Sequence, residues 1–223
     1  MDEFTMLAFN EQEAPTRSEL AAACRQLPPP RAPTSTLPVH SEDVKEDGFF
    51  QGLCKALQDI RVVRRYMEEV VHCYDMTLSP WQDISLGVKV ARAHYMQPIE
   101  QNIPGWLRRL AGVPAAAKAT AIFQLGHNSD SNEVTMVHST SIPKIMYGDR
   151  FRVRMTMTFK LNADSSTTHV EIFGEVIWIE NLPLAFAPVK RVVEQTVRSE
   201  LRRLAPGGAR FMRDVGLTMR TAD

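Results

Sequence analysis

Residues 151–161 read FRVRMTMTFKL, and apolar and polar side chains alternate along the whole stretch. Because successive side chains of a β-strand point to opposite faces of its sheet, this pattern predicts a strand with one apolar and one polar face. A turn sequence follows at 162–166, and a second alternating stretch covers 168–180. The two stretches therefore predict an antiparallel hairpin. Gly174 within the second stretch predicts a bulge or a bend, and hence a curved sheet.

The same two-residue period extends the sheet upstream of this hairpin. Alternation predicts three further strands, at residues 86–96, 117–125 and 134–142. Long strands joined by short connections favour an antiparallel arrangement, in which one face can be apolar and the other polar.

Helices are predicted before the sheet. Apolar residues at helical spacing occur over 49–57 and over 60–71, and charged residues occupy the other side of the second stretch. Ser41, followed by two acidic residues, is the expected N-cap of the first helix, and Asp59 is the expected N-cap of the second.

A long amphipathic helix is predicted after the sheet. Pro188 suits a helix start, and the turn-forming sequence 206–208, Pro-Gly-Gly, predicts its end. Such a helix is expected to pack with its apolar side against the concave apolar face of the sheet. The predicted fold is therefore α+β, a curved antiparallel sheet wrapped around a long C-terminal helix. The apolar stripe of this helix consists of Val189, Val193, Val197, Leu201 and Leu204.

One domain is expected in a chain of 223 residues. Residues 1–46 are rich in proline and polar residues and predict a flexible arm. The domain itself is expected over 47–206, and residues 207–223 are expected to form a C-terminal tail.

Charge and cysteine content narrow the classes of function. Lysine plus arginine equals aspartate plus glutamate at 26 each, so the composition predicts no nucleic-acid partner. The first 50 residues hold nine acidic residues against four basic, whereas 185–223 hold eight basic against four acidic, so the C-terminal part could meet an anionic surface. Cys24, Cys54 and Cys73 form no metal-binding pattern, and we expect neither a metal nor a cofactor.

The sequence predicts a cytoplasmic protein. The first six residues carry acidic rather than basic side chains, unlike a signal peptide, and no apolar run approaches the ~20 residues of a membrane span. Peripheral association with intracellular membranes fits the same observations.

Several short sequences, in order along the chain, resemble one family. Residues 141–151, SIPKIMYGDRF, resemble the proline, tyrosine, glycine, acid and phenylalanine signature of VASt domains, a branch of the StAR-related lipid-transfer domains with a helix-grip fold. Residues 79–81, Ser-Pro-Trp, are similar to the family's segment after its helices, and 92–98 to the strand that follows. Val-Ile-Trp at 176–178 precedes the amphipathic helix. The resemblance spans about 49–204.

The chain also departs from this family in three places. Residues 36–40 supply only a weak version of the family's first strand, and 103–117 form a longer insertion than expected. The GRAM domain and the membrane span that accompany the family's transporters at membrane contact sites are missing from the sequence. Transport that depends on them would not follow from the resemblance alone.

The resemblance implies an apolar cavity between the sheet and the C-terminal helix, with a lipid, and specifically a sterol, as its expected ligand. Taken singly, each expected lining residue is more often ordinary core than cavity wall, although the set as a whole indicates a cavity better than its members do. A cavity filled by side chains would leave a protein-interaction module instead. Methionine is suggestive because its flexible side chain adapts to a rigid ligand. The expected ligand-binding residues are Met155, Met157, Phe159, Val176, Trp178, Val193 and Val197.

The insertion contains a candidate membrane-contact segment. Three apolar residues would lie on one side of a helical turn and two arginines on the other, a pattern typical of short interfacial anchors. A loop helix packed on the body explains the same pattern as well. The residues concerned are Trp106, Leu107, Arg108, Arg109 and Leu110.

A cyclase-like or hydratase-like enzyme is the third reading. Glu171 and Glu175 would be its acid–base candidates only if they faced the interior. His94 and His138 lie on predicted strands, where a neutral histidine with one hydrogen-bond partner, or one that meets a sterol hydroxyl, explains them better than a base. The sequence 147–149, Tyr-Gly-Asp, predicts a turn rather than a catalytic motif.

Overall fold

The computed structural model describes residues 30–33, 36–85, 87–99, 114–143, 145, 147–163, 166–180 and 187–220. Strands β7 (Phe151–Leu161) and β8 (Thr168–Trp178) form the predicted antiparallel hairpin, with Phe151 opposite Trp178 and Leu161 opposite Thr168. The register runs without a break through Gly174, so the bulge expected there is absent from this strand pair.

The hairpin belongs to an eight-stranded sheet in the order β1-β8-β7-β6-β5-β4-β2, in which β3 pairs with β4 outside this path. Every pairing is antiparallel, and each predicted strand is present with ends shifted by a few residues. The remaining strands are β1 (His40–Val44), β2 (Tyr74–Leu78), β3 (Gln82–Ser85), β4 (Val88–Pro98), β5 (Ala116–Asn128) and β6 (Glu133–Ser141).

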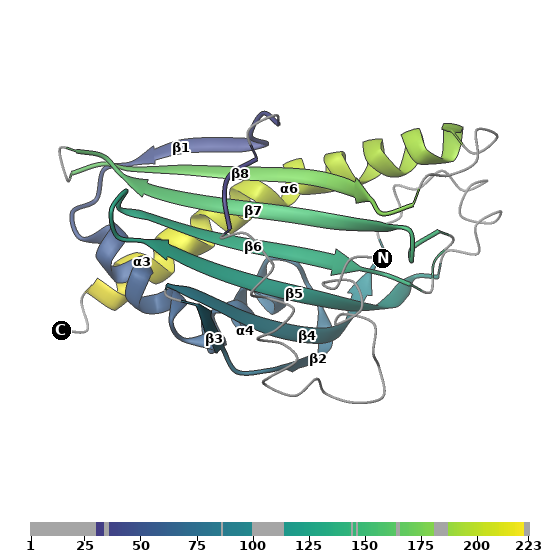
Figure 1. Cartoon of the computed structure of the whole chain (residues 1–223), viewed down its shortest axis with the longest axis horizontal. Coiled ribbons are helices and arrows are strands. Elements are labelled where there is room, and N and C mark those ends of the chain that lie inside the picture. The colour runs from purple at the N-terminus through teal and green to yellow at the C-terminus, as the bar shows by residue number, and fades with distance from the viewer. Residues whose placement is uncertain are drawn as a thin grey trace.

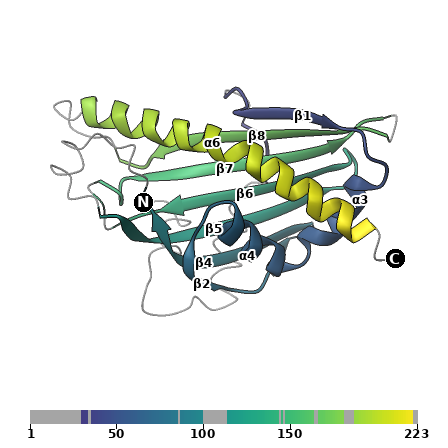
Figure 2. The ribbon, with the colours of Figure 1, turned by 180° about the vertical axis from the view of Figure 1, so that it is seen from behind.

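The three described helices lie on one face of this curved sheet, as Figures 1 and 2 show from opposite sides. They are α3 (Phe49–Leu57), α4 (Ile60–Glu69) and the long α6 (Ala187–Arg220), which crosses the strands diagonally. We call the sheet face under these helices the inner face and the opposite one the outer face. The fold is α+β, a curved antiparallel sheet around a long C-terminal helix, as predicted.

Asp59 caps α4 as predicted, because its side chain accepts a hydrogen bond from the Arg61 backbone N–H at 2.9 Å. The cap predicted for the first helix is wrong. Ser41 lies in strand β1, and α3 begins after Gly48, whose φ is 74°. Strand β1 lies at the edge of the sheet and pairs only with β8, so most of its side chains stay partly exposed and can be polar. Its sequence therefore lacks the apolar alternation that predicts a strand.

The predicted division of the chain therefore changes at both ends. Strand β1 belongs to the sheet, although the arm was expected to reach residue 46. Residues 1–29 of that arm lie outside the described residues.

The C-terminal helix does not end at 206–208, as the prediction had it, but runs to Arg220 with Pro206 inside it. Burial explains the difference. Ala209, Met212 and Val215 beyond the proline are buried in the same core as α3 and the sheet, and this packing outweighs the local preference of the proline and glycines for a helix end. Most of the predicted C-terminal tail is thus part of the folded core.

The two halves of α6 differ in how they pack. From residue 187 to 200 no side chain is buried, and the valines there are only half-buried. From Leu201 onward, apolar side chains are buried regularly, and Phe211 meets Tyr66 of α4 edge-on at 5.9 Å. The second half anchors the helix, and the first half lies over a space that side chains do not fill.

Candidate functional site

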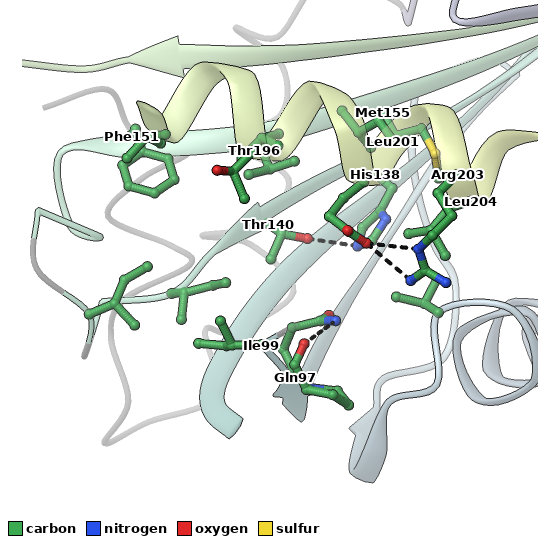
Figure 3. Close-up of a pocket in the computed structure, with 18 of the residues that line it drawn as sticks. Gln97, Ile99, His138, Thr140, Phe151, Met155, Thr196, Leu201, Arg203 and Leu204 are labelled. Atoms are coloured by element: carbon green, nitrogen blue, oxygen red, sulfur yellow. Dashed lines mark hydrogen bonds and ion pairs between the residues drawn. The ribbon is translucent and has the colours of Figure 1, made fainter. Parts of the chain in front are cut away.

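A cavity of about 270 Å³ lies between the first half of α6 and the inner face of the sheet (Figure 3). The helix contributes Val193 and Val197, and the sheet contributes Phe151 and Met155. The size is slightly below the ~300 to 1,000 Å³ typical of small-molecule sites. Exposed residues such as Arg203 also line it, so the cavity reaches the protein surface.

The cavity exists because the helix is held at one end. Its packed half is fixed against α3 and the sheet, whereas the half-buried valines of residues 189–197 line the cavity, and Val197 also packs against the core. Each Å² of apolar surface that stays uncovered forgoes about 25 cal/mol of the free energy that burial supplies. A bound apolar molecule would recover it.

One wall of the cavity carries a short chain of polar groups. His138 Nε2 lies 2.8 Å from Thr140 Oγ1, which in turn lies 3.0 Å from the Tyr95 hydroxyl. These residues come from β6 and β4 and point inward because they share the strand parity of Met136 and Ala93 in the core. His138 and Thr140 line the cavity, and Figure 3 shows the hydrogen bond between them.

The His138 imidazole is held neutral. Burial lowers its pKa to about 4, and the ring stacks on Phe123 with centroids 4.6 Å apart and planes 7° from parallel. Because Nε2 faces Thr140, Nδ1 is the ring nitrogen left for a ligand. The pair can hydrogen-bond one uncharged polar group but offers no fixed charge.

Charged groups occur only toward the surface side of the described lining. Glu200 and Arg203 of α6 form an ion pair at 3.0 Å, drawn in Figure 3. Gln97 at the end of β4 accepts a hydrogen bond from the Cys73 thiol at 3.4 Å and donates one to the Pro98 carbonyl. The walls are therefore apolar, with one neutral polar pair inside and an ion pair near the rim.

The predicted ligand-binding residues fall into three groups. Met155, Val193 and Val197 line the cavity. Met157 and Phe159 are fully buried in the packed core, where Met157 lies under Gly208 of α6.

Val176 and Trp178 are half-buried and lie outside the cavity lining. The Trp178 indole instead donates a hydrogen bond to Glu194 at 2.8 Å and contacts the Phe151 ring. The five predicted membrane-contact residues, 106–110, lie outside the described residues.

The residues considered for catalysis do not converge. Glu171 and Glu175 lie opposite Thr158 and Arg154 on the outer face, and Glu175 pairs with Arg154 at 3.4 Å. His94 also lies on the outer face, with Nδ1 3.0 Å from Thr120 Oγ1.

The sequence 147–149 forms the predicted turn, in which Gly148 packs so closely on the Ile142 carbonyl that no side chain would fit.

Several residues that line the cavity or, like Tyr95, hydrogen-bond to its wall escaped prediction. Thr140 and Tyr95 could have been found from strand parity, since each lies an even number of residues from an inward apolar neighbour. Val192, Thr196 and Glu200 of α6 could not, because they depend on the rotation of the helix over the sheet.

The described residues show two further absences. They contain no group of acidic, histidine and cysteine side chains placed to hold a metal ion. None of the helices in the described part of the chain is both long and apolar enough to cross a bilayer.

A curved antiparallel sheet that holds a long C-terminal helix over an apolar cavity defines the helix-grip class of proteins. Within that class the chain belongs to the VASt family, the VAD1 Analog of StAR-related lipid transfer domain, whose family model matches residues 45–200. This range begins directly after β1 and stops inside α6, at the boundary between its two halves. No curated protein sequence matches the chain.

Solved structures with similar folds include distant proteins. TTHA0849 from Thermus thermophilus is 9% identical, with a TM-score of 0.41, and the match covers 80% of this chain and 95% of that one. The Zhui aromatase/cyclase from Streptomyces sp. R1128 is 11% identical, with a TM-score of 0.42 and coverage of 82% and 91%. Ginseng major latex-like protein 151 from Panax ginseng is 10% identical, with a TM-score of 0.29 and coverage of 72% and 93%.

Proposed function

We propose that this chain binds a lipid, with a sterol as the expected ligand, in the cavity between α6 and the inner face of the sheet. The main support for this proposal is the contrast between the two halves of α6. An amphipathic helix that buries every turn from Leu201 onward leaves its valines half-buried above a cavity. An apolar ligand under those valines would complete the core.

The ligand would carry one uncharged polar group. In this proposal a hydroxyl or a carbonyl of the lipid hydrogen-bonds to the His138 and Thr140 pair, whose neutral state suits a sterol hydroxyl better than a carboxylate or a phosphate. A sterol body is larger than 270 Å³ would hold without adjustment, so part of it would lie at the open side, near Glu200 and Arg203.

Binding without catalysis fits the lining. Glu200 is the carboxylate among the described lining residues, and it is paired with Arg203 rather than with His138. A general acid or base needs a partner group within hydrogen-bond reach of the reacting atom. An open cavity likewise fits a ligand-binding protein better than an interaction module with a filled core.

Transfer between membranes would need a membrane contact, and Trp106, Leu107, Arg108, Arg109 and Leu110 remain the predicted segment for it. Cytoplasmic location with transient attachment to intracellular membranes is the setting that this function requires.

Mass spectrometry of lipid extracted from the purified full chain tests the proposal. We expect a sterol or another lipid with one neutral polar group, at a level approaching one molecule per chain. Preparations that contain no lipid and fail to take up sterols from a panel of fluorescent lipids would contradict it.

A further inference from the structure

Much of the outer face of the sheet is buried although no described helix covers it. Many side chains that point outward from β5 to β8 have exposures of 9% or less, whereas α3, α4 and α6 all lie on the inner face (Figures 1 and 2). These buried outward residues include Ile122, Gln124, Val137, Ser139, Thr156 and Phe173.

A short described stretch, residues 30–33, touches this face. A Cβ built on Gly126 of β5 would lie 2.4 Å from Pro30 Cγ, so the proline ring rests directly on the strand. Gly126 and Ser41 of β1 lie in one row across the sheet, through successive partners in β6, β7 and β8. Pro30 and Ser41 thus lie at the two ends of a row that crosses the outer face.

Contacts along this row do not reach the other buried side chains of the outer face. Ser139 lies four residues along β6 from Thr135, the partner of Gly126, which is about 13 Å at the rise of a strand. Ser139 is nevertheless 4% exposed, and its row neighbour Ile122 is 2% exposed. Burial also lowers the pKa of Arg92, in the same row. Another part of the chain must cover these residues.

We propose that residues 1–29 dock on the outer face and form a third layer over β5, β6 and β7. They join Pro30, which already lies on this face, and fully extended they exceed the width of the sheet several-fold. Their apolar residues, which include Phe4, Leu7 and Phe9, suit the outward Val137 and Phe173.

Charge favours residues 1–29 as the cover over residues 100–113, the other segment that is long enough to reach this face. Residues 1–29 hold five acidic side chains against two basic, and strands β4 to β8 present a basic excess on the outer face, where Arg92, Lys118, Arg152, Arg154 and Lys160 stand against Glu133, Glu171 and Glu175. Residues 100–113 hold one acidic side chain against two basic, the same sign as the face. Opposite charges favour the N-terminal segment.

Thiol labelling of the folded full chain tests the docking. Ser139→Cys places a nearly isosteric thiol under the proposed cover, and Lys160→Cys on the same face of β7 is the exposed control. A protease site inserted between residues 33 and 34 allows residues 1–33 to be cut away after folding. Maleimide labelling at position 139, quantified by peptide mass spectrometry, is compared before and after the cut segment is removed.

We expect slow labelling of the Ser139→Cys thiol in the intact chain and a rate about tenfold higher or more after removal, because labelling of a covered thiol waits for local opening. The Lys160→Cys rate should not change. Native Cys73, 5% exposed beneath the helices, reports unfolding in the same sample. Fast labelling before the cut, or equally slow labelling after it, overturns the proposal, and the second result assigns the cover to residues 100–113 or to a second copy.

If removal of residues 1–33 unfolds the protein, so that Cys73 also reacts, charge-reversal variants of the uncut chain test the docking instead. Reversal of Glu11, Glu13 and Glu19 to lysine should raise the labelling rate at position 139 several-fold and leave Cys73 protected. The matched reversal of Arg17 and Arg25 to glutamate should not raise it. Equal rates in the two variants would rule out docking of this segment.

Discussion

Leu201 of α6 lies directly against Gly174 of β8, so that a Cβ on Gly174 would be 2.4 Å from Leu201 Cδ1 and 3.0 Å from its Cβ. The helix approaches the strand this closely because position 174 carries no side chain. Leu201 is also the first buried residue of α6 and a lining residue of the cavity. The contact marks the point where the helix leaves the cavity and meets the sheet.

The variant Gly174→Ala should lower the free energy of unfolding by about 1 to 3 kcal/mol, because the added methyl group overlaps the Leu201 side chain. Urea denaturation measures the change. In a Leu201→Ala background the same substitution should cost clearly less, since the overlap is removed. Equal costs in both backgrounds would show that the two residues are not coupled.

The variant Val193→Trp should abolish sterol binding, because an indole on the cavity wall takes the space of the ligand. We expect at least a tenfold weaker affinity, about 1.4 kcal/mol, in a titration with a fluorescent sterol. Arg191→Trp, on the exposed side of the same helix, is the control and should bind normally. A folded Val193→Trp protein with unchanged affinity would place the ligand elsewhere.

Stability should fall as the pH drops below the ordinary His138 pKa of 6.5. In the folded protein burial holds this pKa at about 4, so the unfolded chain takes up a proton first, and stability present above pH 6.5 is lost between pH 6.5 and 4. The loss should be about 2 kcal/mol at pH 5. Urea denaturation at pH 7 and pH 5 tests this, and His138→Gln should show a shallower pH dependence.

The second half of α6 should be essential for folding. Met212 is fully buried, and Met212→Ala should cost about 2 to 5 kcal/mol in urea denaturation. Arg210→Ala, on the exposed side of the same turn, should change stability by no more than about 0.5 kcal/mol. A chain that ends at residue 206 should fail to show a cooperative unfolding transition, and a stable fold without residues 207–220 would contradict the packing described here.

The double variant Trp106→Ala, Leu107→Ala should sediment less with anionic liposomes and bind sterol in solution as before. Tryptophan favours the membrane interface, and each nearby arginine adds about 1 kcal/mol on an anionic leaflet, which gives weak attachment that salt reduces. Equal sedimentation of the variant and the native chain would remove this segment from the proposed membrane contact.

The sequence predicts some elements far better than others, for physical reasons. The β7 and β8 strands follow from alternation, because one face of each is buried against the core over its length. The end of α6 does not, since Pro206 signals a stop locally while burial of Met212 rewards continuation. Local preference and tertiary packing conflict there, and packing prevails.

The cavity could be placed from the sequence only in outline. Met155 and Met157 share a strand face and differ by one alternation step, yet one lines the cavity and the other packs under Gly208. Their difference depends on where α6 descends onto the sheet, which is set by the contact of Gly174 with Leu201. No local pattern carries that information.

Elements from opposite ends of the described chain meet in the folded domain. Strand β1 pairs with β8, and Phe49 of α3 packs against Gly216 near the end of α6. A chain emerging from the ribosome must therefore carry an inner sheet face that is incompletely covered until residue 216 has left the exit tunnel. Contacts between such distant parts of a chain slow its folding, and the apolar inner face is exposed to aggregation until they form.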